Sequence, residues 1–152
     1  MSTKGLVCRR SAVFLIGSAL ASPAFTIPET RAGQDAPLAI RGFDPVAYFT
    51  DYKPMLGSPD FQFEWDEHRY QFASAPHRDM FKAEPLRYAP QFANFCAMAL
   101  TRGELEEANP EYWLISDGKL YLFGKPVGPE LFQRSLAENL AKARENAWIT
   151  RR

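Results

Sequence analysis

One stretch of the chain alternates apolar and polar residues in the manner of paired β-strands. Gln62 and Glu64 separate aromatic residues, and the alternation resumes beyond a turn around residues 66–68. The aromatic positions are Phe61, Phe63, Trp65, Tyr70 and Phe72. Because successive side chains of a strand point to opposite faces, this spacing places the rings on one face. The pattern predicts a β-hairpin with one aromatic face.

A second stretch predicts another hairpin. The apolar runs 112–115 and 119–123 flank Ser116-Asp117-Gly118. Asp-Gly is favoured in two-residue hairpin turns because both of its positions accept positive φ. We therefore expect a strand on each side of this turn.

Short helices are indicated by their capping residues. Asp44 is a typical N-cap residue and Pro45 suits a first helical position, so residues 46–49 should form a short helix. That helix is expected to bury Tyr48 or Phe49.

Ser74 predicts a second cap, with Pro76 in the first turn of the helix that follows. This helix should carry Met80 and Phe81 inward. It must end before Pro85, because the residue before a proline disfavours the helical conformation. A further short turn is expected over residues 85–88.

From Pro129 onward the apolar residues recur at helical spacing. Phe132, Leu136, Leu140 and Ala143 share one face, which predicts the longest helix of the domain with this stripe against the core. Together with the two hairpins and the short capped helices, this C-terminal helix indicates a small single domain of the α+β class over residues 38–150.

The N-terminus has the features of an export signal. Arg9-Arg10 precedes a mildly apolar run over residues 11–21, and small residues follow at 22–24. The paired arginine favours the twin-arginine route, whereas Ala12 and Val13 at positions that usually hold Phe and Leu leave the general secretion route open. The apolar run is shorter than the roughly 20 residues that span a bilayer, so no membrane anchor is expected.

The signal sets the expected boundaries and location. Residues 1–24 are interpreted as a signal peptide and residues 25–37 as a flexible lead-in to the domain. We expect a periplasmic or secreted bacterial protein after signal cleavage.

The charge balance argues against two classes of partner. The chain has 18 basic and 18 acidic residues, and loss of Lys4, Arg9 and Arg10 with the signal leaves 15 basic residues against 18 acidic ones. No basic run then remains to follow a phosphate backbone or an anionic membrane. Nucleic acid and membrane surfaces are therefore not expected partners.

Cys96 is the single thiol of the exported chain, because Cys8 leaves with the signal. An internal disulfide is excluded on that reading. Cys96 stands in the apolar segment 90–100, which is expected to form a buried loop passing into a strand. Four roles remain open for it: a buried packing residue, a metal ligand, a reactive thiol, or a disulfide link between two chains.

An ordered series of motifs resembles the exported proteins of the YHS-domain family. The pieces are Gly42-Phe43-Asp44-Pro45-Val46-Ala47-Tyr48-Phe49, Tyr70 and Phe72 before Ala73-Ser74-Ala75, Arg78-Asp79-Met80-Phe81 with Pro85, Tyr88-Ala89-Pro90-Gln91, and Phe95-Cys96-Ala97. The likeness covers nearly the whole exported chain. It implies a small α+β domain and, by analogy with metal-handling YHS and TRASH modules, a soft-metal role.

The chain departs from the family pattern at four positions. Ala47 and Ala73 stand where the metal-handling members carry cysteines. Ala93-Asn94 replaces two glycines that usually precede the aromatic neighbour of the cysteine. If the backbone has positive φ there, Asn94 tolerates it more easily than Ala93.

The soft donors that remain suit copper(I) better than zinc. The candidate metal set is Cys96, Met98, Met80 and His77. Thiolate, thioether and imidazole suit a soft ion at low coordination, whereas a closed zinc site needs about four N or S ligands in a spacing that the sequence lacks. The simpler interpretation of both histidines is structural: His77 near a helix start and His68 at a hairpin turn are expected to be exposed surface residues.

Catalytic patterns are missing from the sequence. It contains neither a glycine-rich phosphate loop nor a Gly-x-Ser-x-Gly elbow, and the apolar neighbours of Cys96 disfavour a thiolate. We expect a non-enzymatic protein without a cofactor that binds a small ligand or a protein partner through an aromatic surface near Cys96. The candidate ligand-binding residues are Cys96, Tyr48, Tyr70, Tyr88 and Phe95. The alternative is a periplasmic copper-binding or thiol-sensing protein centred on Cys96.

Overall fold

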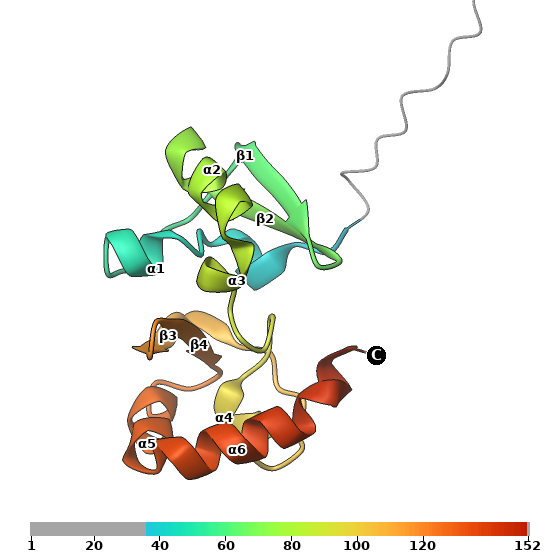
Figure 1. The fold of residues 1–152 in the computed structure, drawn as a ribbon, viewed down its shortest axis with the longest axis vertical. Coiled ribbons are helices and arrows are strands. Elements are labelled where there is room, and N and C mark those ends of the chain that lie inside the picture. The colour runs from blue at the N-terminus through green and yellow to red at the C-terminus, as the bar shows by residue number, and fades with distance from the viewer. Residues whose placement is uncertain (1–35, 152) are drawn as a thin grey trace, which may run out of the picture. The chain divides into compact units, whose positions relative to one another are not determined.

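A computed structural model describes residues 36–151, and Figure 1 shows the path of the chain. Two antiparallel two-stranded sheets, β1–β2 and β3–β4, combine with short helices and a C-terminal helix, which confirms the predicted α+β class. The elements in chain order, with 3₁₀ turns written η, are η1 (Ala39–Gly42), α1 (Ala47–Thr50), β1 (Ser58–Trp65), β2 (His68–Phe72), α2 (Ala75–Ala83), α3 (Pro85–Tyr88), α4 (Ala97–Leu100), β3 (Asn109–Ser116), β4 (Lys119–Phe123), α5 (Gly128–Arg134), α6 (Leu136–Asn146) and η2 (Ala147–Arg151).

The first predicted hairpin is confirmed. β1 and β2 pair as far as Trp65 and His68, and the turn between them consists of Asp66 and Glu67. These two residues have φ values of 49° and 64°, the two positive values that match the right-handed twist of the strands. His68 is therefore the first residue of β2 and only half-buried, rather than an exposed turn residue as expected.

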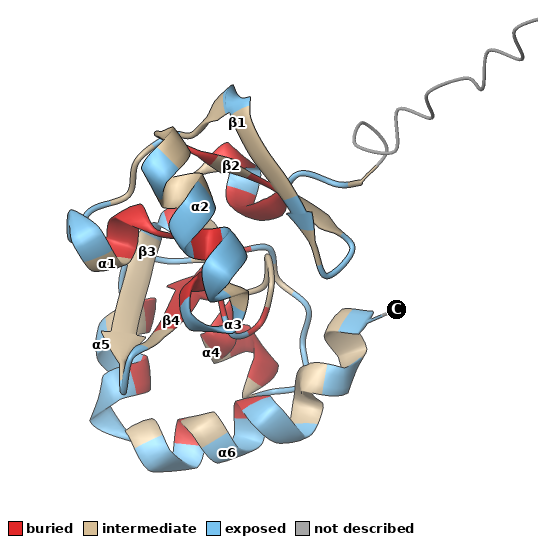
Figure 2. Ribbon diagram, turned by 45° about the horizontal axis from the view of Figure 1, so that its top comes forward, coloured by how far each residue is buried: buried red, intermediate tan, exposed pale blue. Residues whose placement is uncertain are grey.

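The second hairpin is also confirmed, and its strand β4 separates two hydrophobic cores. Leu120 and Leu122 belong to the first core, whereas Tyr121 and Phe123 belong to the second. All four side chains are at most 2% exposed, and Figure 2 colours β4 as buried. A strand covered on both faces has apolar residues at successive positions, which accounts for the unbroken apolar run after Asp117-Gly118.

The first core is centred on Phe81 of α2. This helix packs against β1 and β2, and the ring of Phe81 lies 4.7 Å from that of Tyr70 and 5.2 Å from that of Phe72 between centroids. Phe81 is fully buried, but Met80, expected inward with it, is 37% exposed. Successive helical residues point about 100° apart, so a helix packed on one side buries only one of two neighbours.

The second core lies among α4, α5, α6 and β4, and α4 corrects a prediction. Residues 90–100 do not pass into a strand, because Cys96 is the N-cap residue of the helical turn Ala97–Leu100. The carbonyl of Cys96 accepts a hydrogen bond from the Leu100 amide at 3.2 Å. Ala97 and Leu100 are fully buried in this core. In so short an apolar run, burial does not distinguish a strand from a helical turn.

The C-terminal apolar stripe forms two helices rather than one continuous helix from Pro129. The backbone breaks at Ser135, with φ −130° and ψ 50°, between α5 and α6. The side-chain amide of Asn139 donates to the carbonyl of Phe132 at 3.0 Å and satisfies one of the free acceptors at the end of α5. Phe132 and Ala143 are fully buried, so the stripe faces the core as expected.

The predicted cap of α2 is confirmed. The Ser74 hydroxyl accepts a hydrogen bond from the backbone amide of His77 at 3.3 Å, and Pro76 lies in the first turn. The helix ends at Ala83, before Pro85. In α1, Tyr48 is the fully buried residue and Phe49 is only half-buried.

The predicted signal peptide (1–24) and most of the predicted lead-in (25–35) lie outside the described residues. Near the start of the described residues, the carbonyl of Pro37 accepts a hydrogen bond from the Arg69 amide at 2.9 Å, and Leu38 bridges to the same residue. Within residues 36–151, no helix has the length and apolar character needed to cross a bilayer.

Candidate functional site

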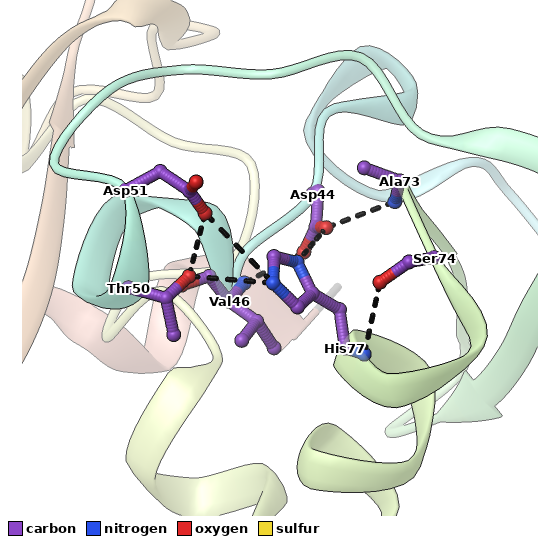
Figure 3. Close-up of polar contacts among 7 residues, drawn as sticks. All are labelled: Asp44, Val46, Thr50, Asp51, Ala73, Ser74 and His77. Atoms are coloured by element: carbon purple, nitrogen blue, oxygen red, sulfur yellow. Dashed lines mark hydrogen bonds and ion pairs between the residues drawn. The ribbon is translucent and has the colours of Figure 1, made fainter.

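A buried carboxylate connects two segments that are distant in the sequence. Asp44 is fully buried and accepts three hydrogen bonds, as Figure 3 shows. Its Oδ1 accepts from the Val46 amide at 2.8 Å, and its Oδ2 accepts from the Ala73 amide at 2.9 Å and from His77 Nδ1 at 2.6 Å. The expected capping role is wrong, because α1 begins at Ala47 with Val46 as its N-cap residue, and Asp44 instead accepts the Val46 amide in the turn before the helix. Asp44 also joins the turn before α1 to the end of β2 and the start of α2.

His77 is positioned by the cap of α2 and by Asp44. The side chain of His77 is 17% exposed, so it is not the free surface residue that the sequence suggested. Its Nε2 atom lies 3.4 Å from the Thr50 hydroxyl and 3.8 Å from Asp51 Oδ2, at the end of α1. Figure 3 shows the imidazole between the two carboxylates, with Nδ1 toward Asp44 and Nε2 toward Asp51.

The contacts of Asp44 assign the tautomer of the neutral imidazole. An ionised carboxylate only accepts hydrogen bonds, so Nδ1 carries the hydrogen and Nε2 keeps its lone pair. That lone pair points toward Thr50 and Asp51. Of the acceptors within reach of the Thr50 hydroxyl, Asp51 Oδ2 at 2.7 Å is nearer than the Val46 carbonyl at 3.2 Å and Nε2 itself. Nε2 is therefore an unblocked acceptor that can take a proton or bind a cation.

The three candidate tyrosines lie in the interior and do not form an aromatic surface. Tyr48 is fully buried, and Tyr70 and Tyr88 are each 3% exposed, all within the first core. The Tyr48 hydroxyl donates to the carbonyl of Pro110 at 2.9 Å. These three tyrosines, which their sequence positions suggested as ligand contacts, therefore pack in the hydrophobic core.

Stability should fall steeply at alkaline pH because of Tyr48 and Tyr70. Burial, with smaller contributions from nearby carboxylates, raises the pKa of both phenols well above the ordinary value near 10. Below pH 10 both groups stay protonated in the folded and the unfolded chain. Above it the unfolded chain loses these protons first, so each tyrosine lowers the free energy of unfolding by about 1.4 kcal/mol per pH unit.

Urea titrations at a series of pH values between 9.5 and 11.5 measure this slope. Tyr70→Phe should remove about half of the tyrosine contribution while keeping the ring in the core. An equal alkaline slope in the wild type and in Tyr70→Phe would contradict the assignment.

Cys96 and Phe95 belong to the other core. Cys96 is 4% exposed, and its amide donates to the Glu106 carbonyl at 2.8 Å; Phe95 is half-buried beside it. Of the four roles left open for Cys96, packing agrees with this burial. A metal, sensing or intermolecular role would require the thiol to become accessible.

The four candidate metal ligands do not gather at one place. Met98 packs with Cys96 in the second core, whereas Met80 and His77 are on α2, which packs on the first hairpin. In the part of the chain that the structure describes, no group of three or more His, Cys, Asp or Glu side chains is arranged to hold a metal ion.

The segment before Cys96 has one strained position. Ala93, not Asn94, has positive φ, at 50°. The side chain of Asn94 instead accepts a hydrogen bond from the Ile40 amide at 2.6 Å. A left-handed conformation costs a residue with a Cβ roughly 1–2 kcal/mol relative to glycine. Ala93 carries this cost, whereas Asn94 contributes its side-chain hydrogen bond.

A pocket lies beside the turn of the first hairpin. It encloses about 510 Å³ and is lined by residues of that turn, of the segment 89–93 and of η2. The buried rings of Tyr70 and Phe92 contribute to its wall, together with the polar side chains of His68, Gln91 and Thr150. A more open depression of about 530 Å³ adjoins it, because Trp65 and Leu86 line both.

Comparison of the chain with protein-family models, curated proteins and solved structures found no significant match.

Sequence reasoning missed the coupling of His77 to Asp44. The available signals were local: Asp44 precedes a proline, and His77 follows the Ser74 cap by three residues. Each signal indicated a helix start, but neither indicated that the two helix starts share a carboxylate. Their contact spans 33 positions and depends on how α2 packs against the turn before α1.

Proposed function

We propose that the chain is an exported, YHS-like domain of non-enzymatic type that binds a small ligand in the pocket beside the first hairpin turn. The observation that carries the proposal is the pocket itself. Its volume of about 510 Å³ lies in the range of about 300–1,000 Å³ typical of small-molecule sites. Its lining joins aromatic and aliphatic residues to six polar or charged ones, so a ligand there must itself carry polar groups. The six are Asp66, Glu67, His68, Gln91, Thr150 and Arg151.

The family part of the proposal rests on the order of the motifs and on their contacts. Asp44 of the first motif accepts hydrogen bonds from Ala73 in the second motif and from His77, one residue before Arg78 of the third. Pro90 of the fourth motif bridges to Leu120 on β4. Because these motifs contact one another in the fold, we interpret them as parts of one family pattern. The export part rests on residues 1–24 of the sequence.

The lining favours a ligand with a flat apolar part and a polar end. Trp65 is half-buried and Leu86 is 71% exposed, so these two side chains supply the apolar surface of the wall. Tyr70 and Phe92 are almost fully buried and contribute little of it. Asp66, Glu67 and Arg151 place charges of both signs around the opening. A charged or hydrogen-bonding end can meet these groups while the ring lies against the aromatic wall.

A variant that fills the pocket tests the proposal. Gln91 is exposed and lines the pocket, and its backbone amide donates a hydrogen bond to the Leu120 carbonyl. Gln91→Trp therefore narrows the site without removing that contact. Gln133→Trp, on an exposed position of α5, is the matched control. The probe is a library of aromatic amines and aromatic acids observed by saturation-transfer NMR.

We expect binders whose signal is lost in Gln91→Trp and kept in Gln133→Trp. Binders that survive equally in both variants, or a library without any binder, would overturn this site.

The alternative of a copper-binding or thiol-sensing protein centred on Cys96 has less support. It needs a soft ion or an oxidant to reach a thiol that is 4% exposed. Of the other three candidate ligands, only Met98 packs in the same core as Cys96.

A further inference from the structure

The geometry points to a divalent transition-metal site at the open side of the Asp44–His77 pair, with His77 Nε2 and Asp51 Oδ2 as its protein ligands. We propose an ion of the Zn²⁺, Cu²⁺ or Ni²⁺ class. This site is separate from the ligand pocket and does not depend on the proposed function.

Several hydrogen-bond acceptor atoms lie close together around His77 Nε2, and too few hydrogen atoms are available to form hydrogen bonds between all of them. The lone pair of His77 Nε2 faces the Thr50 hydroxyl oxygen at 3.4 Å and Asp51 Oδ2 at 3.8 Å. With a neutral imidazole, the single hydrogen among these atoms is that of the Thr50 hydroxyl, and Asp51 Oδ2 at 2.7 Å is a nearer acceptor for it than the Val46 carbonyl at 3.2 Å or Nε2. Nε2 and Asp51 are left facing each other as two acceptors, an arrangement that a cation between them completes.

The charge balance also favours a cation. Asp44 and Asp51 carry two negative charges when ionised, and within residues 36–151 neither forms an ion pair with a lysine or an arginine. A cation held by Nε2 and Asp51 Oδ2 therefore lies close to two carboxylates, which stabilise its charge.

Asp44 supplies the outer support that metal-binding histidines usually have. A histidine that binds a metal through one nitrogen commonly donates its other N–H to a carboxylate, which fixes the ring and makes it a better ligand. His77 has this arrangement already, with Nδ1 2.6 Å from the fully buried Asp44.

The distances require only a small adjustment. Two ligands bound at about 2.05 Å with tetrahedral geometry are about 3.4 Å apart. His77 Nε2 and Asp51 Oδ2 are 3.8 Å apart, and the Asp51 side chain is 38% exposed at the end of α1, so a small rotation closes the difference. Water fills the other positions, since the protein offers two side-chain ligands rather than a closed set.

The ligand types select the class of ion. An imidazole nitrogen with a carboxylate suits Zn²⁺, Cu²⁺ and Ni²⁺, whereas Mg²⁺ and Ca²⁺ take oxygen ligands almost exclusively. Copper(I) favours thiolate and thioether ligands, which this site lacks. Of the three ions, Cu²⁺ should bind most tightly.

Isothermal titration of tag-free protein at pH 7.5 with ZnCl₂, NiCl₂ and CuCl₂, each alone, tests the site. We expect one equivalent of ion. His77→Asn and Asp51→Asn should each weaken binding by about tenfold or more. His77→Asn keeps a side-chain donor near the Nδ1 position, so the support of Asp44 can persist while the Nε2 ligand is removed. Thermal unfolding of each variant identifies any loss of fold.

Controls locate the ion. His68→Asn and Asp60→Asn change the same residue types elsewhere in the domain, and Cys96→Ser removes the thiol. All three should leave the affinity unchanged. In NMR spectra, substoichiometric Cu²⁺ should broaden the signals of His77, Thr50 and Asp51 first. Binding that survives His77→Asn, or that disappears in His68→Asn or Cys96→Ser, would overturn the proposal. So would the lack of binding of all three ions, which would leave a proton as the partner of Nε2.

Discussion

Replacing Asp44 by alanine is expected to lower the free energy of unfolding by about 3–5 kcal/mol. The carboxylate is fully buried and is the acceptor for the amides of Val46 and Ala73 and for His77 Nδ1. Its removal leaves the buried Val46 amide and the partly buried Ala73 amide without an acceptor and also creates a cavity. Because the three donors belong to segments on either side of the first hairpin, the loss should affect the whole domain.

Urea denaturation followed by circular dichroism measures this effect. Asp44→Asn keeps an acceptor oxygen and should cost less than Asp44→Ala. Asp60→Ala, at an exposed position of β1, should stay within about 0.5 kcal/mol of the wild type. If Asp44→Ala were as stable as Asp60→Ala, the carboxylate would not hold these segments together.

Replacing Phe81 by alanine should cost about 3–5 kcal/mol, the usual range for removing a buried phenylalanine ring. Phe81 is fully buried, and its ring makes edge or tilted contacts with Phe63, Trp65, Tyr70 and Phe72. These rings come from β1, β2 and α2, so the substitution removes the side chain that joins the helix to the hairpin.

The neighbouring residue provides the control for Phe81→Ala. Met80 is 37% exposed on the same helix, and Met80→Ala should cost well under half as much. Phe81→Leu should fall between the two, since it retains part of the buried volume. Equal destabilisation by Met80→Ala and Phe81→Ala in thermal or urea unfolding would contradict the assignment of Phe81 as the centre of the first core.

Predictions from the sequence succeeded where a few adjacent residues decide the conformation. Asp117-Gly118 accepts the two positive φ values of its turn, and Ser74 accepts the hydrogen bond of a helix start. Both effects act within three or four residues, so the structure at these places follows from local chemistry.

Predictions failed where burial depends on which side of an element is covered. Residues 90–100 are apolar in either a strand or a helical turn, and only their packing against β4 and α6 accounts for α4. Met80 and Phe81 differ little in hydrophobic character, yet only Phe81 faces the first hairpin. The aromatic ligand surface expected around Tyr48, Tyr70 and Tyr88 failed for the same reason, because apolar rings suit a core as well as a binding surface.

The sequence by itself determined the α+β class, the two hairpins and the cap of α2, because these depend on periodicity and on turn and cap residues close together in the chain. Only the tertiary structure decided that β4 is covered on both faces and that Asp44 meets His77 across 33 positions. The packing of whole helices and strands decides which distant donors reach a carboxylate. It also decides which elements cover each face of a strand. The residues beside Asp44 and His77 therefore do not reveal the cluster in which a cation could be held.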